Sequence, residues 1–504
     1  MANEQTPVPH EAGISKDRVW NWNDYHSVFS YRYGSPDMRH IWSEGHKAEV
    51  GADVWIAVAA TQNKVGLVTD EQVQDLRDHR QDYIAGIDEA LSREMDPKNP
   101  RYTGHDILAA ISVYGDVAPE GGKIVHRPLT SEDYLSNIEV VQMVESVDLV
   151  EAGLRNTLIN FGKQIEEYKD LPVLGQTHMQ AGEPTTLGYR LAAHAQDFLE
   201  DYKKLQFVKG RMLGKGIKGP VGTMAEVETL LDGKDMDPLQ HEVDVMDQLG
   251  LEAFPISNQT YPRKLTADVI GVLADIGVSA QRFGLNMRIY QSSLFDELAE
   301  PRNSRDRGSS AMPHKRNPRH AENIIALARG IKFKHLEAQE VAANVVMERG
   351  IDDSAGKRSF LPEAFLAADE VLKRVGDIAG RLVVNKDSIW RNLHTFSQFT
   401  ATAPIMAEMT KGGADRQESH EVLAQIAQRA FDSFRATGAN TFGEEVLENP
   451  EVRKYMTEEQ IKMMIDQADH HVGMSAKLCD IFLQEHLYPA LFPESNGVKE
   501  DSKE

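Results

Sequence analysis

The sequence predicts a mostly α protein with three domains. Apolar residues recur at steps of three and four along several long segments without proline, which is typical of long amphipathic helices. Segments with the period-two alternation of β-strands are few, and no short internal repeat is present. The length of 504 residues fits roughly three domains of about 150 residues each. We expect an N-terminal helical domain at 1–126, a central long-helix bundle with a functional loop at 127–383, and a C-terminal helical domain at 384–504.

The composition excludes several classes of function. A hydrophobic content of 41% with 26% charged residues is ordinary for a globular protein. The formal charge of −23 opposes binding to nucleic acid or to an anionic membrane. The chain starts without an apolar signal core and has no run of 18 apolar residues, so we expect neither secretion nor a membrane span. Its single cysteine, Cys479, rules out an intramolecular disulfide and favours a cytoplasmic location.

In the N-terminal domain, two features indicate helix starts. Thr69 and Gln72 have the spacing of a capping box, and an amphipathic segment follows them. Further on, His105 and Asp106 stand at the beginning of an apolar run. A lone histidine in such a place is more often a helix-start or core residue than a catalyst.

Five long helices are predicted for the central domain. Thr130 or Ser131 can cap the first, because acidic residues follow in its first turn. The segment 171–188 is expected to be a loop, with Pro184 in the first turn of the next helix. The apolar periods place the helices approximately at 131–161, 188–213, 262–287, 321–346 and 357–383.

Two other patterns are rejected as ligand sites. Gly214, Gly216 and Gly219 match GxGxxG, but they follow a helix and run into Pro220, whereas a dinucleotide motif opens a helix after a strand. We expect a turn-rich excursion there. His470 and the adjacent histidine lack an HExxH motif or a cysteine cluster, so no metal site is expected.

The most informative segment is 308–318, which reads GSSAMPHKRNP. The polar segment before it predicts an exposed loop that carries Ser309 and Ser310. A helix is expected after Pro318, and the N–H groups at this junction, with Lys315 and Asn317, could hold a carboxylate. A hydroxyl beside an anion site suits removal of a proton from the carbon next to a carboxylate. By composition alone, an ordinary turn is the better interpretation.

This segment resembles the signature loop of the fumarase/aspartase superfamily, and MPHKRNP is closer to the adenylosuccinate lyases than to the fumarases or argininosuccinate lyases. Carboxymuconate cycloisomerases look similar at this loop. RYGSPDM at 32–38, GHDI at 104–107 and ERGIDDSAGKR at 348–358 favour adenylosuccinate lyase, and DDSA resembles its eukaryotic-like branch. The resemblance covers nearly the whole chain. It implies a fumarase/aspartase-like fold and a homotetramer with a twenty-helix core, whose active sites are shared between subunits.

The resemblance also implies roles for individual residues. Ser309 would be the base, and His178, in a TxHxQ motif, the acid oriented by Glu322. A histidine suits this role because its ordinary pKa is about 6.5. Lys315 would stabilise the developing charge, and His105 would contact the nucleotide or assist proton transfer. The implied substrate-binding residues are Arg32, Tyr33, Asp106, Thr130, Ser131, Thr177, Gln259, Arg263, Ser310, Met312, Asn317, Arg349, Ser354 and Arg358.

The implied reaction is β-elimination of fumarate from adenylosuccinate, giving AMP, and from the succinyl-carboxamide ribotide of purine synthesis. Neither a metal nor an organic cofactor is expected, because protonation activates the leaving amine. Two alternatives remain. One is a carboxymuconate cycloisomerase or another fumarate-releasing lyase. The other is a non-catalytic helical scaffold, which the intact set Ser309, His178, Lys315, Asn317 and Glu322 opposes.

Overall fold

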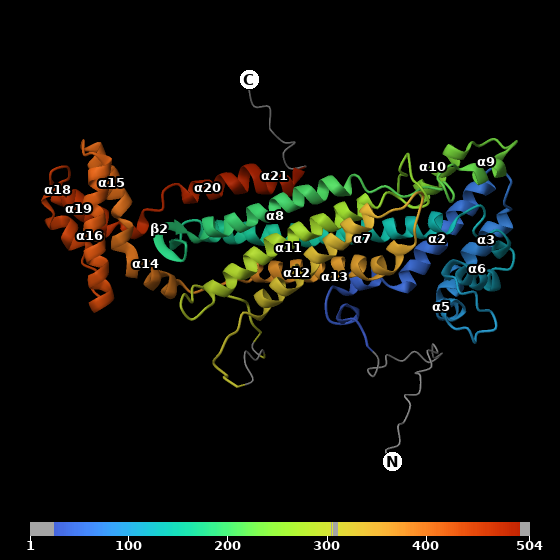
Figure 1. Cartoon of the computed structure of the whole chain (residues 1–504), viewed down its shortest axis with the longest axis horizontal. Helices are drawn as coiled ribbons and strands as arrows, with labels where there is room; N and C mark the ends of the chain where they lie inside the picture. Colours follow the sequence, from blue (N-terminus) through green and yellow to red (C-terminus); the bar gives the residue numbers. More distant parts are fainter. Residues whose placement is uncertain (1–24, 304, 306–310, 494–504) are drawn as a thin grey trace, which may run out of the picture. The chain divides into compact units, whose positions relative to one another are not determined.

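The computed structural model describes residues 25–303, 305 and 311–493, and α-helices make up most of this part of the chain (Figure 1). The mostly α fold class is therefore confirmed. Among the described residues, no helix is long and apolar enough to cross a membrane.

All five predicted long helices are present. Their starts agree with the apolar periods to within a few residues, except that the fifth begins five residues earlier than expected. The first starts at Ser131, where the Asp133 carboxylate accepts a hydrogen bond from Thr130 N at 2.9 Å. The five helices are α7 (Ser131–Tyr168), α8 (Leu187–Lys209), α11 (Lys264–Tyr290), α12 (Arg319–Ala343) and α13 (Asp352–Gly380).

The chain divides into two compact units, and the divisions fall inside these five helices. Unit 1 comprises 1–152, 203–277 and 327–370, and unit 2 comprises 153–202, 278–326 and 371–504. Because each unit collects three separate stretches of sequence, residues far apart along the chain meet within it. The three predicted domains follow a different division of the chain, and their boundaries stay a prediction.

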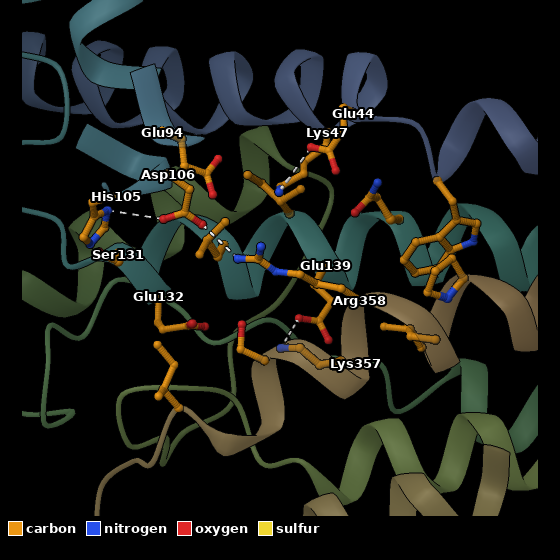
Figure 2. A pocket seen from close by; sticks show the side chains of 18 of the residues that line it. Glu44, Lys47, Glu94, His105, Asp106, Ser131, Glu132, Glu139, Lys357 and Arg358 are labelled. Atoms are coloured by element: carbon orange, nitrogen blue, oxygen red, sulfur yellow. Dashed lines mark hydrogen bonds and ion pairs between the residues drawn. The ribbon is translucent and has the colours of Figure 1, made fainter. Parts of the chain in front are cut away.

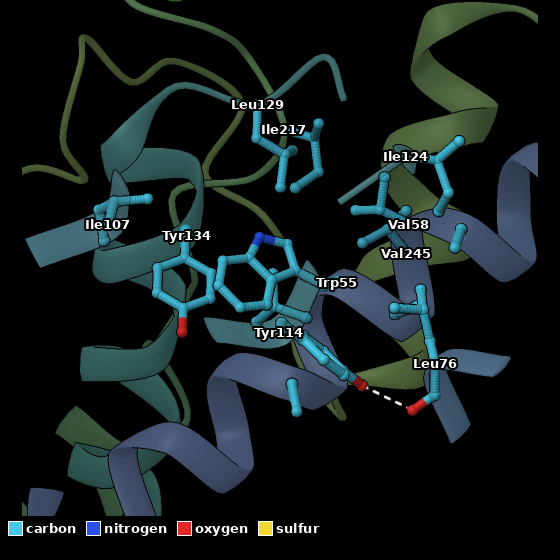
Figure 3. Packing of buried hydrophobic residues seen from close by; sticks show 14 of the residues in the cluster. Trp55, Val58, Leu76, Ile107, Tyr114, Ile124, Leu129, Tyr134, Ile217 and Val245 are labelled. Carbon is cyan, nitrogen blue, oxygen red and sulfur yellow. Dashed lines mark hydrogen bonds between the residues drawn. The ribbon is translucent and has the colours of Figure 1, made fainter. Parts of the chain in front are cut away.

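Unit 1 is organised around stacked aromatic rings. Trp55 stacks on Tyr134 with ring centroids 4.3 Å apart, and Tyr83 stacks on Tyr114 at 4.5 Å. Leu76, Ile107 and further aliphatic side chains surround these rings (Figure 3). Its shorter helices are α1 (Pro36–Ile41), α2 (Glu44–Asn63), α3 (Asp70–Asp78), α4 (Arg80–Ala85), α5 (Ile87–Met95), α6 (Asp106–Val117), α9 (Ala225–Leu231) and α10 (Pro238–Gln248).

Both N-terminal helix starts are confirmed. The capping box of Thr69 and Gln72 begins α3, and His105 is the N-cap of α6. The amphipathic segment after Thr69 forms three short helices, α3 to α5. The GxGxxG segment forms turns in which Gly216 and Gly219 have φ of 81° and 76°, as expected for an excursion without a helix.

Unit 2 contains the main departure from the sequence expectation. The segment expected as a loop is an antiparallel hairpin of β1 (Pro172–Thr177) and β2 (Gln180–Thr186), so the prediction that Pro184 begins a helix is wrong. Two further strands, β3 (Leu298–Ala299) and β4 (Val383–Val384), pair with each other. The C-terminal helices are α14 (Lys386–Thr400), α15 (Thr402–Lys411), α16 (Arg416–Thr437), α17 (Phe442–Glu448), α18 (Pro450–Arg453), α19 (Glu458–Asp466), α20 (Ser475–Ile481) and α21 (Tyr488–Leu491).

Candidate active site

A cavity of about 420 Å³ lies in unit 1, and helices α2, α6, α7 and α13 contribute to its walls (Figure 2). Its volume is in the range of sites that bind small molecules. Six of the predicted site residues line it, although three separate motifs supply them: His105, Asp106, Ser131, Arg349, Ser354 and Arg358. The fold thus brings together residues that stand far apart in the sequence and that the resemblance assigned to one site.

His105 and Asp106 reach this cavity from the start of α6. The His105 Nδ1 accepts a hydrogen bond from Ile107 N at 3.2 Å, as an N-cap does. This contact leaves Nε2 as the nitrogen that can face a ligand. Asp106 accepts a hydrogen bond from Arg358 at 3.3 Å, and Glu94 lies beside it in the cavity wall. Burial, followed by the negative charge of Asp106, raises the pKa of Glu94.

Arg349 precedes α13, and Arg358 lies in the second turn of that helix. Arg349 pairs with Glu132 at 2.7 Å and donates a hydrogen bond to the predicted residue Gln259 at 3.3 Å. One full turn of α13 separates Ser354 from Arg358, so both project to the same side of the helix. Two guanidinium groups and a hydroxyl can hold a phosphate group, and here each guanidinium is also paired with a carboxylate, Arg349 with Glu132 and Arg358 with Asp106.

Glu132, the partner of Arg349, belongs to a buried network of charged side chains. Arg263, whose side chain is 1% exposed, lies 2.8 Å from Asp353, 3.7 Å from Glu139 and 3.8 Å from Glu132. Lys357 pairs with Glu139 at 2.7 Å. Burial alone would raise the pKa of Glu139, but the positive charges of Lys357 and Arg263 hold it below its ordinary value. Arg263 belongs to this network and is not among the cavity-lining residues.

The predicted acid, His178, lies in unit 2 at the tip of the β1–β2 hairpin. His178 and Met179 have φ of 54° and 59°, so they form the two central positions of a tight turn whose backbone is left-handed at both. Thr177 and Gln180 pair across the turn. The His178 side chain is exposed, which leaves its ring free to meet a ligand.

Ser309 and Ser310 lie outside the described residues, but the end of the signature segment is described. Met312 and Lys315 are exposed and Asn317 is half-buried. The N–H groups expected to hold a carboxylate are already used, because His320 N and Ala321 N donate to Glu300 at 3.1 and 2.5 Å. These two N–H groups thus already bind a carboxylate of the chain itself, and the predicted anion site with Lys315 and Asn317 stays a prediction.

Other predicted residues lie apart from the cavity lining. Glu322, in the first turn of α12, lies 3.9 Å from Arg288. Arg32 and Tyr33 follow a short 3₁₀ helix near the start of the described chain. Thr130 directly precedes α7. None of these four residues is among those that line the cavity.

Sequence reasoning missed several lining residues, chiefly Lys47, Glu94, Gln142 and Lys357. Lys357 stands next to Arg358 inside the ERGIDDSAGKR motif, so the motif could have predicted it as a site residue. Lys47 and Glu94 stand in no recognised motif. They reach the cavity only because α2 and α5 pack beside α6.

Comparison with known proteins defines the class. A family model described as "Lyase" matches residues 19–332, and one described as "Adenylosuccinate lyase C-terminus" matches residues 398–482. In fold, the chain is similar to a fumarate lyase from Mesorhizobium (TM-score 0.78, 21% identity, covering 91% of this chain and 99% of the other). It is also similar to a 3-carboxy-cis,cis-muconate lactonizing enzyme from Pseudomonas putida (TM-score 0.77, 22% identity, covering 91% and 98%). Together these findings define a lyase of the fumarase/aspartase superfamily.

Curated relatives narrow the class to one family. The chain is 31% identical to the adenylosuccinate lyase of Archaeoglobus fulgidus, over 88% of this chain and 94% of the relative. It is 29% identical to the adenylosuccinate lyases of Schizosaccharomyces pombe, over 95% and 98%, and of Saccharomyces cerevisiae, over 94% and 97%. The chain belongs to the adenylosuccinate lyase family. Since its relatives are both archaeal and eukaryotic, the eukaryotic-like branch stays a prediction.

Proposed function

We propose that this chain eliminates fumarate from adenylosuccinate, giving AMP, and from the succinyl-carboxamide ribotide of purine synthesis, giving the carboxamide ribotide. The single observation that carries this proposal is the cavity in unit 1. It gathers His105, Ser131, Arg349, Ser354 and Arg358, and so offers cations and hydroxyls to the phosphate-bearing end of a nucleotide. The curated relatives are all adenylosuccinate lyases, which supports the choice of substrate.

In this proposal the chemical step is divided between an acid and a base. Ser309 takes the proton from the carbon β to the leaving nitrogen. The electron pair forms the new double bond as the C–N bond breaks, and His178 gives its proton to the departing nitrogen. Charge that develops on the neighbouring carboxylate is stabilised by Lys315 and Asn317. Protonation activates the leaving group, so the step needs neither a metal nor an organic cofactor.

The remaining predicted residues have supporting roles in the same proposal. Arg32, Tyr33, Arg349, Ser354 and Arg358 hold the nucleotide. His105 contacts the nucleotide or assists proton transfer, and Glu322 orients the acid. The other residues assigned to substrate contact are Asp106, Thr130, Ser131, Thr177, Gln259, Arg263, Ser310 and Met312.

We also propose that the enzyme works in the cytoplasm as a homotetramer with shared active sites. Large apolar side chains on the long helices are exposed in the single chain, as expected for surfaces that another copy covers. In unit 1, Phe333 and Leu336 on α12 are 67% and 56% exposed. In unit 2, Val278 and Leu285 on α11 are 53% and 42% exposed. Measuring the mass of the particle in solution tests the tetramer directly.

The reaction is tested by fumarate release from the purified chain. Adenylosuccinate is offered in parallel with argininosuccinate, aspartate and malate, and Ser309→Ala is the control. We expect fumarate from adenylosuccinate alone and its loss in the variant. If a folded tetramer turned over none of these substrates, the proposal would fail. A cycloisomerase or a non-catalytic scaffold would then be the better interpretation.

A further inference from the structure

We propose that His40, His46 and Glu49 bind a divalent transition-metal ion such as Zn²⁺. His40 lies in the last turn of α1, and His46 and Glu49 lie in the first turns of α2. All three belong to unit 1, and none of them lines the cavity described above. The site is therefore separate from the proposed catalytic residues.

The three possible ligand atoms already converge. The Glu49 Oε2 lies 3.1 Å from His46 Nδ1 and 4.0 Å from His40 Nε2, and all three atoms lie within 4.8 Å of one another. A tetrahedral Zn²⁺ with ligands at about 2.0–2.1 Å holds them roughly 3.3 Å apart. His40 Nε2 must approach Glu49 by less than 1 Å from its 4.0 Å distance, and its side chain is 60% exposed.

A fourth residue, Glu145 on α7, orients His46. The His46 Nε2 lies 2.6 Å from the Glu145 carboxylate, so a proton on Nε2 donates to it. With the proton on Nε2, the lone pair of Nδ1 faces the Glu49 carboxylate at 3.1 Å, and the two electron-rich atoms repel each other. A cation or a further proton between them relieves this repulsion. A carboxylate behind a histidine is also the usual outer partner of a metal ligand.

The chemistry of the ligands selects the class of ion. Two imidazoles and one carboxylate suit Zn²⁺, Co²⁺ or Ni²⁺, whereas Mg²⁺ and Ca²⁺ prefer oxygen alone. Three protein ligands leave one position for water. Trp42, Ser43 and Glu44 stand between the two histidines in the sequence and line the cavity, so a bound ion would fix this part of its wall.

The site is tested by titrating the full chain, stripped of metal with a chelator, with Zn²⁺ in a calorimeter. The visible absorption spectrum of the chain with bound Co²⁺ reports the coordination geometry. We expect one ion per chain, and at least a tenfold weaker affinity in His40→Ala and in His46→Ala. Glu145→Gln, which removes only the orienting charge, should weaken binding about tenfold. The matched control is His79→Ala, which should change nothing, because His79 lies 3.1 Å from Asp75 and belongs to no group of three possible metal ligands among the described residues.

Two results would overturn the proposal. One is the absence of stoichiometric binding, which would mean that a proton fills the gap between His46 and Glu49. The other is binding that survives in both His40→Ala and His46→Ala. Loss of folding does not confuse the test, since His40 is largely exposed and each variant is first checked by its unfolding transition in chelator.

Discussion

The charged side chains that line the cavity of unit 1 and the proposed acid and cation of unit 2 differ in how firmly the single chain holds them. In unit 1, Arg349 and Lys357 are already held by buried carboxylates at 2.7 Å. In unit 2, the His178 and Lys315 side chains are exposed. The charged side chains of the cavity are thus held in place within one chain.

The chemical step has a different requirement. Electrostatic stabilisation of a transition state is strong only where water is excluded. Exposed groups such as His178 and Lys315 meet this requirement when another surface covers them. The contrast therefore favours a site completed by other subunits.

The largest effect is expected at the hairpin of unit 2. His178→Asn removes the acid but keeps a residue that tolerates a positive φ. We expect kcat to fall about 10²- to 10⁴-fold with little change in KM, because general acid catalysis contributes that much. Steady-state kinetics of fumarate release measure both constants. Met179→Asn, which also places asparagine at a left-handed position of the turn, is the control. An equal loss of kcat in this variant would mean that the altered turn, and not the lost acid, causes the effect.

The buried network of unit 1 gives the next effect. In Glu132→Gln, Arg349 and Arg263 lose a charged partner in a dry environment, which we expect to cost about 3 kcal/mol of unfolding free energy. KM should rise as well, because Arg349 loses its orientation.

A matched pair in unit 2 separates these two consequences. Arg190 and the buried Glu297 lie 2.9 Å apart, and Glu297→Gln should lower stability similarly without raising KM. Denaturant unfolding measures the stability of both variants, and steady-state kinetics measure their KM. If both variants raised KM alike, Glu132 would have no particular role in binding.

A smaller effect is expected at the cavity wall. Arg358→Ala removes a cation that is 60% exposed and is paired with Asp106. A charged hydrogen bond is worth about 1.5–3 kcal/mol, so KM should rise about 10- to 100-fold while kcat changes little. Arg381→Ala is the control, because Arg381 is 55% exposed and likewise paired with an acid. An unchanged KM in Arg358→Ala would remove this residue from the site.

The smallest effect appears only in acid. Burial lowers the pKa of His241 to about 4, below the unfolded value of about 6.5. The unfolded chain therefore binds a proton that the folded chain does not, so stability is complete above pH 6.5 and falls as the pH approaches 4. His241 contributes about 2 kcal/mol to this loss at pH 5. His241→Leu should remove that part, and unfolding midpoints at pH 5 and pH 7.5 measure it. An unaltered pH dependence would contradict the expectation.

The long helices could be predicted because their apolar period is a local property of the sequence. The hairpin could not, because a tight turn usually carries Asn-Gly, whereas here His178 and Met179 adopt positive φ. The buried network was also beyond local reasoning, since Glu132, Arg263 and Asp353 meet only in the folded unit. The motifs predicted six of the residues that line the cavity, whereas Lys47 was missed because only the packing of α2 brings it there.

The most direct test of a shared site mixes two inactive subunits. His178→Ala and Ser309→Ala chains are dissociated together and reassembled, and fumarate release is compared with that of each variant alone. If the acid and the base of one site come from different chains, roughly a quarter of the sites in random tetramers contain both, and activity returns to about that fraction. No recovery after verified subunit exchange would contradict the account.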